Sequence, residues 1–429
     1  MGSTPTISTQ KAGIIAGLLH LPPPLQFFLV YFFITRGIIK RLFVRRQSLP
    51  PLNIYIHTMQ QRFKPRDLFI ESGYGPNFGD QLILNAYHQL FEGDPVDERV
   101  CFDASDDMSY IIDIGHDDIR SEGMSYGMFI TALTDHPETF QKLWNFSRKY
   151  LYNSDGPHKG YFSWQVSTTE FTMMDPGAAP DGEEYFAMAL LIAAKRFNRP
   201  DYKEDAIKLI NDIKYKPVNE LVGPMIDPER KLVKFSPVLG NDFTDPSYHT
   251  IAFYRAFAEA TGDNTWLDVA ASSLEYLKKA AHPVTALFPD YSEYDGTPKA
   301  MPWFPESDNF SGDAWRVALN LSLDYALFHT DECEREICTR QLNYFNDRRP
   351  YLSDYAVDGS PYPRQGRNAT PGLIAMNAAS AQVLPVGSPL VEPFVADLAN
   401  LAVPIRFWRY YDGMLYLIGL LAATGKIEI

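Results

Sequence analysis

Two short segments far apart in the chain combine a carboxylic acid with glycine and aromatic residues. Residues 120–127 read RSEGMSYG and contain Glu122, and residues 179–186 read APDGEEYF and contain Asp181. A third acid, Asp313, lies in the segment SGDAWR. Cleavage of a sugar linkage needs one carboxylic acid to protonate the leaving oxygen and one carboxylate to activate water, while aromatic faces bind the sugar rings. The three segments therefore indicate acid and base catalysis on glycosidic bonds.

The composition limits the kinds of partner that the chain can bind. The 429 residues carry a formal net charge of −14, and 14% of them are aromatic. Phosphate-binding surfaces are basic, so this charge argues against nucleic acid and is compatible with a neutral ligand such as a sugar. The three cysteines, Cys101, Cys333 and Cys338, provide neither a disulfide framework nor a zinc ligand set. No motif indicates a metal or another cofactor, and we expect none.

The N-terminal segment, residues 1–62, is hydrophobic and basic and differs from the rest of the chain. Its uninterrupted apolar run, residues 25–35, is short for a membrane span, and arginine and lysine alternate with apolar residues after it up to residue 46. This pattern predicts peripheral contact of residues 25–46 with an anionic membrane, and a disordered tail or a segment packed on the domain are the alternatives. A secretory signal would place its charge before the apolar run, so we expect a cytoplasmic protein or one on the cytoplasmic side of a membrane.

From residue 63 onward the chain alternates helical segments with Gly, Pro and Asp, and no change of composition marks a second domain. Apolar residues at helical spacing and helix start signals predict helices in residues 137–152, 186–197, 202–213, 246–260, 267–277, 319–327, 334–345, 372–383, 390–401 and 411–423. Only residues 110–114 and 232–235 alternate as strands do. About eleven or twelve helices with so few strands predict one all-α domain over residues 63–429, in which helical pairs close into a ring.

Residues 123–127, which read GMSYG, also satisfy the G-x-S-x-G pattern of serine hydrolases. In those enzymes the serine lies on a tight turn between a buried strand and a helix. The preceding residues 116–122 read HDDIRSE and are too polar to form the middle strand of a sheet. We therefore reject this interpretation.

The three acid-containing segments, RSEGMSYGM, APDGEEYFAMALLIAAKRF and SGDAWRVALN, together resemble the glycoside hydrolases of family 8. The stretches HKGYFSW, DPSYH, YDGTP and RYYDGMLYL add to the resemblance, which covers residues 63 to 429 and is strongest to the reducing-end xylose-releasing exo-oligoxylanases. Members of this family are inverting enzymes built on an (α/α)6 barrel. The resemblance therefore implies an (α/α)6 barrel and a glycoside hydrolase.

The resemblance also implies a role for each acid. Glu122 matches the general acid of the family, Asp313 the general base, and Asp181 the acid that binds the sugar and helps to hold the attacking water. Glu122 must be protonated to act, which requires that burial or a neighbouring carboxylate such as Asp181 raises its pKa. Asp313 must be ionised, and Arg316, one helical turn further on, favours this form unless it is only a pair on the helix surface.

These assignments have structural alternatives. All three acids lie at predicted helix starts, where a carboxylate also serves as a cap or interacts with the helix dipole. The resemblance assigns sugar contacts to Trp164, Tyr248 and Tyr411, and we predict that these residues and Arg316 bind substrate. An aromatic residue at helical spacing is more often part of the core, and the direction of Trp315 is left open.

The substrate is the least determined property. Overall similarity favours short β-1,4-linked xylo-oligosaccharides, from which xylose is released at the reducing end. The reducing-end enzymes narrow their cleft with a Leu-His-Pro loop, whereas residues 367–371 of this chain read RNATP. Either another group narrows the cleft, or the protein cuts longer chains internally as xylanases, cellulases and chitosanases of the family do. A carbohydrate-binding protein without catalysis on the same scaffold is the alternative of another class.

Overall fold

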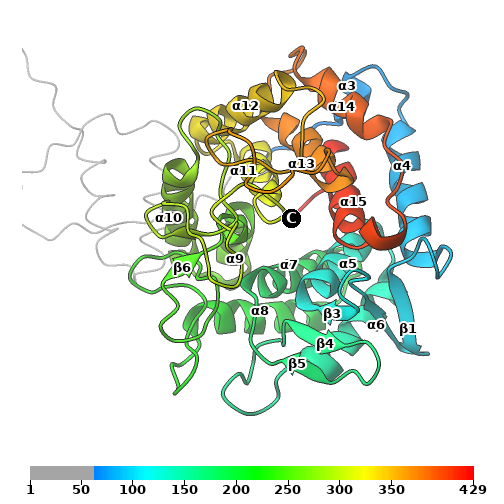
Figure 1. Cartoon of the computed structure of the whole chain (residues 1–429). Coiled ribbons are helices and arrows are strands. Elements are labelled where there is room, and N and C mark those ends of the chain that lie inside the picture. The colour runs from blue at the N-terminus through cyan, green and yellow to red at the C-terminus, as the bar shows by residue number, and fades with distance from the viewer. Residues whose placement is uncertain (1–61) are drawn as a thin grey trace, which may run out of the picture. The chain divides into compact units, whose positions relative to one another are not determined.

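The computed structural model describes residues 62–429, and helices form about half of this part of the chain (Figure 1). The residues predicted to contact a membrane, 25–46, lie outside it, and that contact stays a prediction. No helix among residues 62–429 is long and apolar enough to cross a membrane.

Six helices form an inner ring, and six others cover it from outside (Figure 1). The inner helices are α5 (Ser121–Leu133), α7 (Pro180–Arg196), α9 (Ile251–Thr261), α11 (Trp315–Phe328), α13 (Pro371–Ser380) and α15 (Tyr411–Ala423). The outer helices are α4 (Phe78–Tyr87), α6 (Pro137–Phe146), α8 (Pro200–Tyr215), α10 (Thr265–Ala280), α12 (Glu332–Asn346) and α14 (Val391–Ala399). Each inner helix packs against the next one in the chain, and α15 packs against α5 and closes the ring. The predicted (α/α)6 barrel and its all-α class are thus confirmed.

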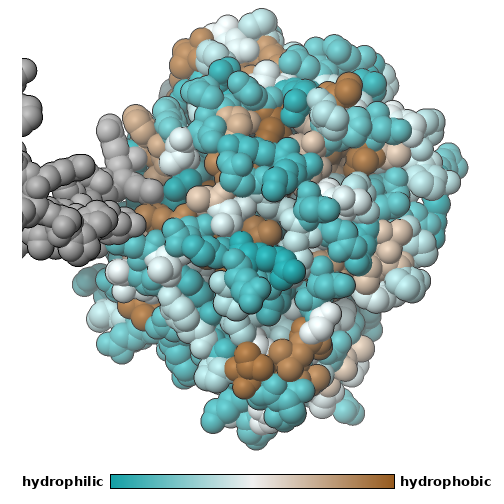
Figure 2. Space-filling view, turned by 90° about the vertical axis from the view of Figure 1, so that its left-hand side faces the viewer, coloured by the Kyte–Doolittle hydropathy of each residue, from teal (hydrophilic) through white to brown (hydrophobic). Residues whose placement is uncertain are grey.

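The sequence pattern explains which helices lie inside. Helix α15 has thirteen residues, of which all but Tyr411 are buried, and after Asp412 it is apolar on all sides, as a helix surrounded by protein is. The outer helix α8 has one apolar face and one charged face, as a helix in contact with solvent does. The face of the molecule on the side of α10, another outer helix, is also mostly hydrophilic (Figure 2). Helices α6, α7, α8 and α13 begin with proline, whose missing N–H and fixed φ suit the first turn.

The predicted helices are present, with irregular turns at several ends. π-Helical or 3-10 turns precede or continue the α-helices at η1 (His88–Glu92), η2 (Ser147–Leu151), η3 (Pro246–Tyr248), η4 (Ala381–Val383) and η5 (Arg406–Arg409). The sequence analysis gave no range for α5, although it placed Glu122 at a helix start, and it did not predict α4 or the short α3 (Leu68–Glu71).

Short antiparallel strands lie in the connections between helices. They are β1 (Cys101–Ser105) with β2 (Met108–Ile111), β3 (Asp118–Arg120) with β4 (Gln165–Ser167) and β5 (Met173–Asp175), and β6 (Phe243–Thr244) with β7 (Ser292–Glu293). The strand predicted at 110–114 overlaps β2, but the strand predicted at 232–235 is wrong. Val233 makes one isolated bridge to Ile226, while the N–H of Phe235 donates to Phe243 at 3.0 Å. Residues 232–235 thus bond to two different segments, so no continuous ladder forms.

A buried carboxyl group between α11 and α12 gives a first prediction. Glu334 on α12 is completely buried, and desolvation, together with the nearby charge of Asp324, raises its pKa to about 10. Because this value lies above that of the unfolded chain, Glu334 weakens the fold progressively as the pH rises through and beyond about 4.5. We expect Glu334→Gln to increase the free energy of unfolding at pH 8 by about 2 kcal/mol.

Denaturant unfolding at pH 8 and pH 5 tests this prediction. The gain should be clearly smaller at pH 5, where Glu334 of the unfolded chain is also partly protonated. Glu336→Gln, on the exposed side of the same helix, is the control and should change stability little at either pH. An equal gain for Glu334→Gln at both values would show that its charge is not the cause.

Candidate active site

Glycines beside two of the acids allow the inner helices to approach closely. A Cβ atom at Gly182 in α7 would lie 2.5 Å from the Oγ of Ser121 in α5, and one at Gly123 would lie 2.6 Å from the ring of Tyr410. Such distances exclude a larger residue at either position unless the neighbouring side chain or backbone shifts. Gly182 therefore lets the start of α7 approach that of α5, and Gly123 leaves room for Tyr410.

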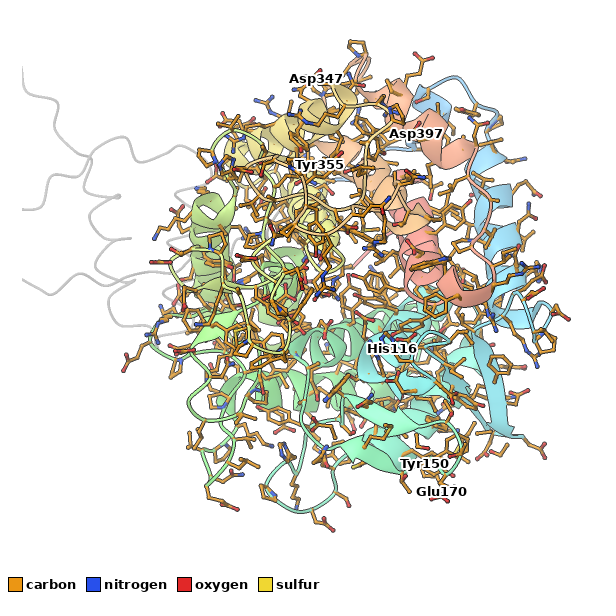
Figure 3. All side chains as sticks on the ribbon, viewed as in Figure 1. His116, Tyr150, Glu170, Asp347, Tyr355 and Asp397 are labelled. Carbon is orange, nitrogen blue, oxygen red and sulfur yellow. The ribbon has the colours of Figure 1, made fainter. Side chains whose placement is uncertain are left out.

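Glu122 is the residue through which α5 faces a cavity. All other residues of α5 are buried, whereas the Glu122 side chain is 15% exposed. The cavity has a volume of about 270 Å³. It is lined by Asp113, Gly115, His116, Arg120, Glu122, Asp290, Phe304, Ser311, Gly312, Asp313, Arg367, Phe407, Trp408, Tyr410, Tyr411 and Asp412. Figure 3 shows His116 close to α5 and near the inner ring. Two of the three predicted acids, Glu122 and Asp313, thus line one cavity.

The guanidinium group of Arg316 joins all three acids. Its Nη1 donates to Glu122 Oε2 at 3.0 Å and to Asp181 Oδ2 at 2.8 Å, and its Nη2 donates to Asp313 Oδ1 at 2.9 Å. The Arg316 side chain is only 4% exposed, so the alternative of a helix-surface pair is wrong. Glu122 and Asp313 bind different nitrogens of the same guanidinium group, so one cation contacts both carboxylates.

Burial and neighbouring charges shift the pKa values of Glu122 and Asp313. Burial raises the pKa of Glu122 to about 7; the charge of Arg316 opposes this shift, and the carboxylates of Asp181 and Asp313 add to it. Burial also raises the pKa of Asp313, but Arg316 opposes this shift. Tyr410 donates from its hydroxyl to Glu122 Oε1 at 2.9 Å. Glu122 can therefore give up or take a proton near neutral pH, as a general acid must.

For Asp313 and Asp181, the geometry tests the alternative that each acid only caps a helix. Helix α11 begins after Ala314, and no side chain at that N-cap position bonds to the helix start. The carboxylate of Asp313 binds Arg316 instead. Asp181 Oδ1 does accept from the N–H of Gly182 at 2.8 Å, while its Oδ2 accepts from Arg316. Capping alone therefore explains neither acid.

The predicted aromatic contacts differ in their positions. Tyr411 lines the cavity and donates from its hydroxyl to Gly312 O at 2.7 Å. Tyr248 is buried, with its ring 5.8 Å from the guanidinium carbon of Arg316. Trp164 is half-buried beside Arg120 and is not among the lining residues of this cavity. The Nε1 of Trp315 donates to Ser353 O at 3.0 Å inside the protein, so Trp315 belongs to the core.

Several residues of the site were missed by the sequence analysis. Asp245 is fully buried with its Oδ2 3.7 Å from Arg316, and burial, with the charge of Asp313, raises its pKa well above the usual range. Tyr126 and Ser247 each bind Arg316, at 2.8 Å and 2.7 Å. Asp245 and Ser247 belong to the stretch DPSYH, and that stretch was the available signal. Within residues 62–429 no group of His, Cys, Asp and Glu side chains is arranged to hold a metal ion.

A ring of helix pairs with an acid that titrates near neutral pH and a second carboxylate in the same cavity defines an acid–base glycosidase. Residues 111–424 match the family model described as Glycosyl hydrolases family 8. The chain belongs to this family of inverting O-glycosyl hydrolases, as the sequence motifs predicted.

Known proteins similar to this chain include exo-oligoxylanases, a xylanase and endoglucanases. The reducing-end xylose-releasing exo-oligoxylanase Rex8A of Paenibacillus barcinonensis is 35% identical over 85% of this chain and 96% of its own length. A family 8 xylanase of Teredinibacter turnerae, solved as a catalytic mutant with xylohexaose, is 35% identical with a TM-score of 0.80, over 85% of this chain and 97% of that one. Endoglucanase 2 of Ruminiclostridium josui is 28% identical over 72% of this chain and 64% of its own length.

Proposed function

We propose that this glycoside hydrolase cleaves β-1,4-linked xylo-oligosaccharides with inversion and releases xylose from their reducing end. The observation that carries the proposal is the group of three carboxylates around Arg316, two of which line the cavity. The substrate class is supported by the similarity to Rex8A and to the xylanase that binds xylohexaose.

The proposed reaction is a single displacement at the anomeric carbon. Glu122 gives its proton to the glycosidic oxygen as the bond from that oxygen to the anomeric carbon breaks. A water molecule forms the new bond from the opposite face, and its proton goes to Asp313. Asp181 binds the sugar and helps to hold this water, while the positive charge of Arg316 favours the ionised form of Asp313. The products are xylose and an oligosaccharide shortened by one unit.

We also propose that Arg367 narrows the cleft in place of the missing Leu-His-Pro loop. Arg367 lines the cavity and is held by Asp354, to which Nε and Nη2 donate at 2.9 Å and 2.8 Å. Its guanidinium carbon also lies 5.2 Å from the centre of the Trp315 ring. Because the Arg367 side chain is held by two hydrogen bonds and by a cation–π contact, it has little freedom to leave the cavity.

A time course of products from xylotriose, xylotetraose and xylan tests both proposals. We expect the wild type to form xylose and the oligosaccharide one unit shorter, with the anomeric configuration of the new end inverted in proton NMR spectra. Arg367→Ala should open the cleft and form xylobiose directly from xylotetraose, at a total rate within about tenfold of the wild type because the three acids are unchanged.

Arg364→Ala is the control, because this exposed residue of the same loop pairs with Glu306 and does not line the cavity. It should leave the product pattern as it is. A spread of fragments from xylan with the wild type would support an endo-acting glycanase instead. Binding of these chains without any product would support the carbohydrate-binding alternative.

A further inference from the structure

Asp290 is a buried acid in the cavity for which the proposed reaction has no role. It lies on the connection between α10 and β7, is 1% exposed, and lines the same cavity as Glu122 and Asp313. A buried carboxyl group is costly unless its oxygens are hydrogen-bonded. Its partners therefore indicate why an acid is present at this position.

All of its side-chain hydrogen bonds come from the turn that carries Asp313. Asp290 Oδ1 accepts from the N–H of Ala314 at 2.9 Å and from the N–H of Ser311 at 3.3 Å. The hydroxyl of Ser311 donates to Asp290 Oδ2. One side chain thus binds the residues on both sides of the pair Gly312 and Asp313.

These bonds hold the turn that precedes helix α11. Ala314 lies at the N-cap position of α11, and alanine has no side-chain oxygen that could fix this turn. The N–H of Ala314 itself is bound by Asp290, 24 residues earlier in the chain. Without it, the buried N–H groups of Ser311 and Ala314 would lose this partner, and the turn would lose a fixed point at each end.

We infer that Asp290 is a positioning residue for the general base, because it fixes the turn from Ser311 to Ala314 and so aims the carboxylate of Asp313 into the cavity. This inference rests on the proposed role of Asp313. Arg316 binds the side-chain carboxylate of Asp313, and Asp290 binds the backbone of the turn that carries Asp313. Both constraints are needed because a general base must lie within hydrogen-bond reach of the attacking water.

Replacing Asp290 with asparagine separates the effect of its charge from that of its hydrogen bonds. Burial and the negative charge of Asp313 raise the pKa of Asp290 to about 8, which favours the neutral form of this side chain. In that form Oδ2 carries the proton and donates to the hydroxyl of Ser311, whereas in the ionised form it accepts from that hydroxyl. Asparagine has the same shape as this neutral form. Its oxygen can accept from the N–H groups of Ser311 and Ala314, and its amide group can donate to the hydroxyl of Ser311.

The test compares Asp290→Ala with Asp290→Asn on xylotetraose. A misplacement of the base by about 1 Å predicts a loss of about 100-fold in kcat for Asp290→Ala, with KM within about threefold of the wild type. Asp290→Asn should retain kcat within about fivefold, because it keeps the hydrogen bonds. Asp67→Ala removes an acid that caps α3 away from the cavity, and it should lower Tm without changing kcat.

A double-mutant cycle shows whether Asp290 acts through Asp313. When Asp313→Asn has already removed the base, adding Asp290→Ala should lower the remaining kcat by less than about threefold. If Asp290→Ala lowers kcat by the same factor in the Asp313→Asn background as in the wild type, the inference is overturned. A folded Asp290→Ala variant with normal kcat would also overturn it. If Asp290→Ala does not fold, Ser311→Ala removes one of the three donors and should show the same dependence on Asp313. Normal kcat in Asp313→Asn itself would instead refute the proposed base.

Discussion

Replacing Glu122 with glutamine is expected to lower kcat about 10³-fold, because glutamine has no proton to give to the leaving oxygen. The amide keeps the shape of the side chain and can still bond to Tyr410 and Arg316. Substrate affinity should therefore change little. Xylose release from xylotetraose measures kcat, and calorimetry with the same substrate measures binding. Binding without turnover is the expected result, and undiminished turnover would exclude Glu122 as the acid.

The same change should alter the pH dependence of the reaction. Since the pKa of Glu122 is raised to about 7, the wild type should lose activity as the pH rises through this value and the proton leaves. Glu122→Gln cannot lose that proton, so its remaining activity should not decline over pH 6 to 8. Glu170→Gln, on the exposed loop between β4 and β5 (Figure 3), is the control and should keep the wild-type profile. A wild-type profile that stays flat up to pH 9 would contradict the assignment.

Replacing Arg316 with methionine is expected to affect both activity and stability. The change leaves Glu122, Asp181 and Asp313 close together without the cation that joins them. We expect a loss of about 10³-fold in kcat, since the substitution removes a charged group that orients both the acid and the base. The free energy of unfolding at pH 7.5 should fall by about 3 to 5 kcal/mol, as in other proteins that lose one member of a buried ion pair.

The sign of the pH effect identifies the cause of this instability. Without the guanidinium, the pKa values of Glu122 and Asp313 rise further in the folded state, so the variant should be least stable at high pH and recover partly at pH 5. Arg255→Met is the matched control, because Arg255 is similarly buried and its Nε lies 2.7 Å from Asp324 Oδ1. This ion pair lies away from the cavity. It should lose stability and retain kcat. Equal stability of Arg316→Met and wild type at pH 7.5 would contradict this account.

The parts of the fold that depend on local pattern could be predicted from the sequence. Apolar residues at helical spacing predicted helix α15 at residues 411–423 with the bounds that the structure shows. The alternation at residues 232–235 failed as a strand signal because its bonding partners lie on two separate segments. Local alternation cannot indicate whether one continuous partner strand is available.

The contacts within the site could be predicted only in part. The spacing of Arg316 and Asp313 indicated their ion pair, but Glu122 is 194 residues away from Arg316, and nothing in the local pattern of either residue shows that they meet. Asp290 was missed for the same reason, since its partners lie 21 to 24 residues further along the chain. The family motifs located the acids, whereas the buried cation and the supporting acid required the packed structure.

The closure of the ring by α15 has a consequence for the order in which the enzyme becomes functional during synthesis. Tyr410, at the start of α15, bonds to Glu122, which a ribosome translates 288 residues earlier. Folding during translation proceeds from the N-terminus, so α5 and α7 emerge long before the last inner helix exists. We therefore expect the nascent chain to hold its acids in an open ring, and the complete cavity to form only after α15 has left the ribosome.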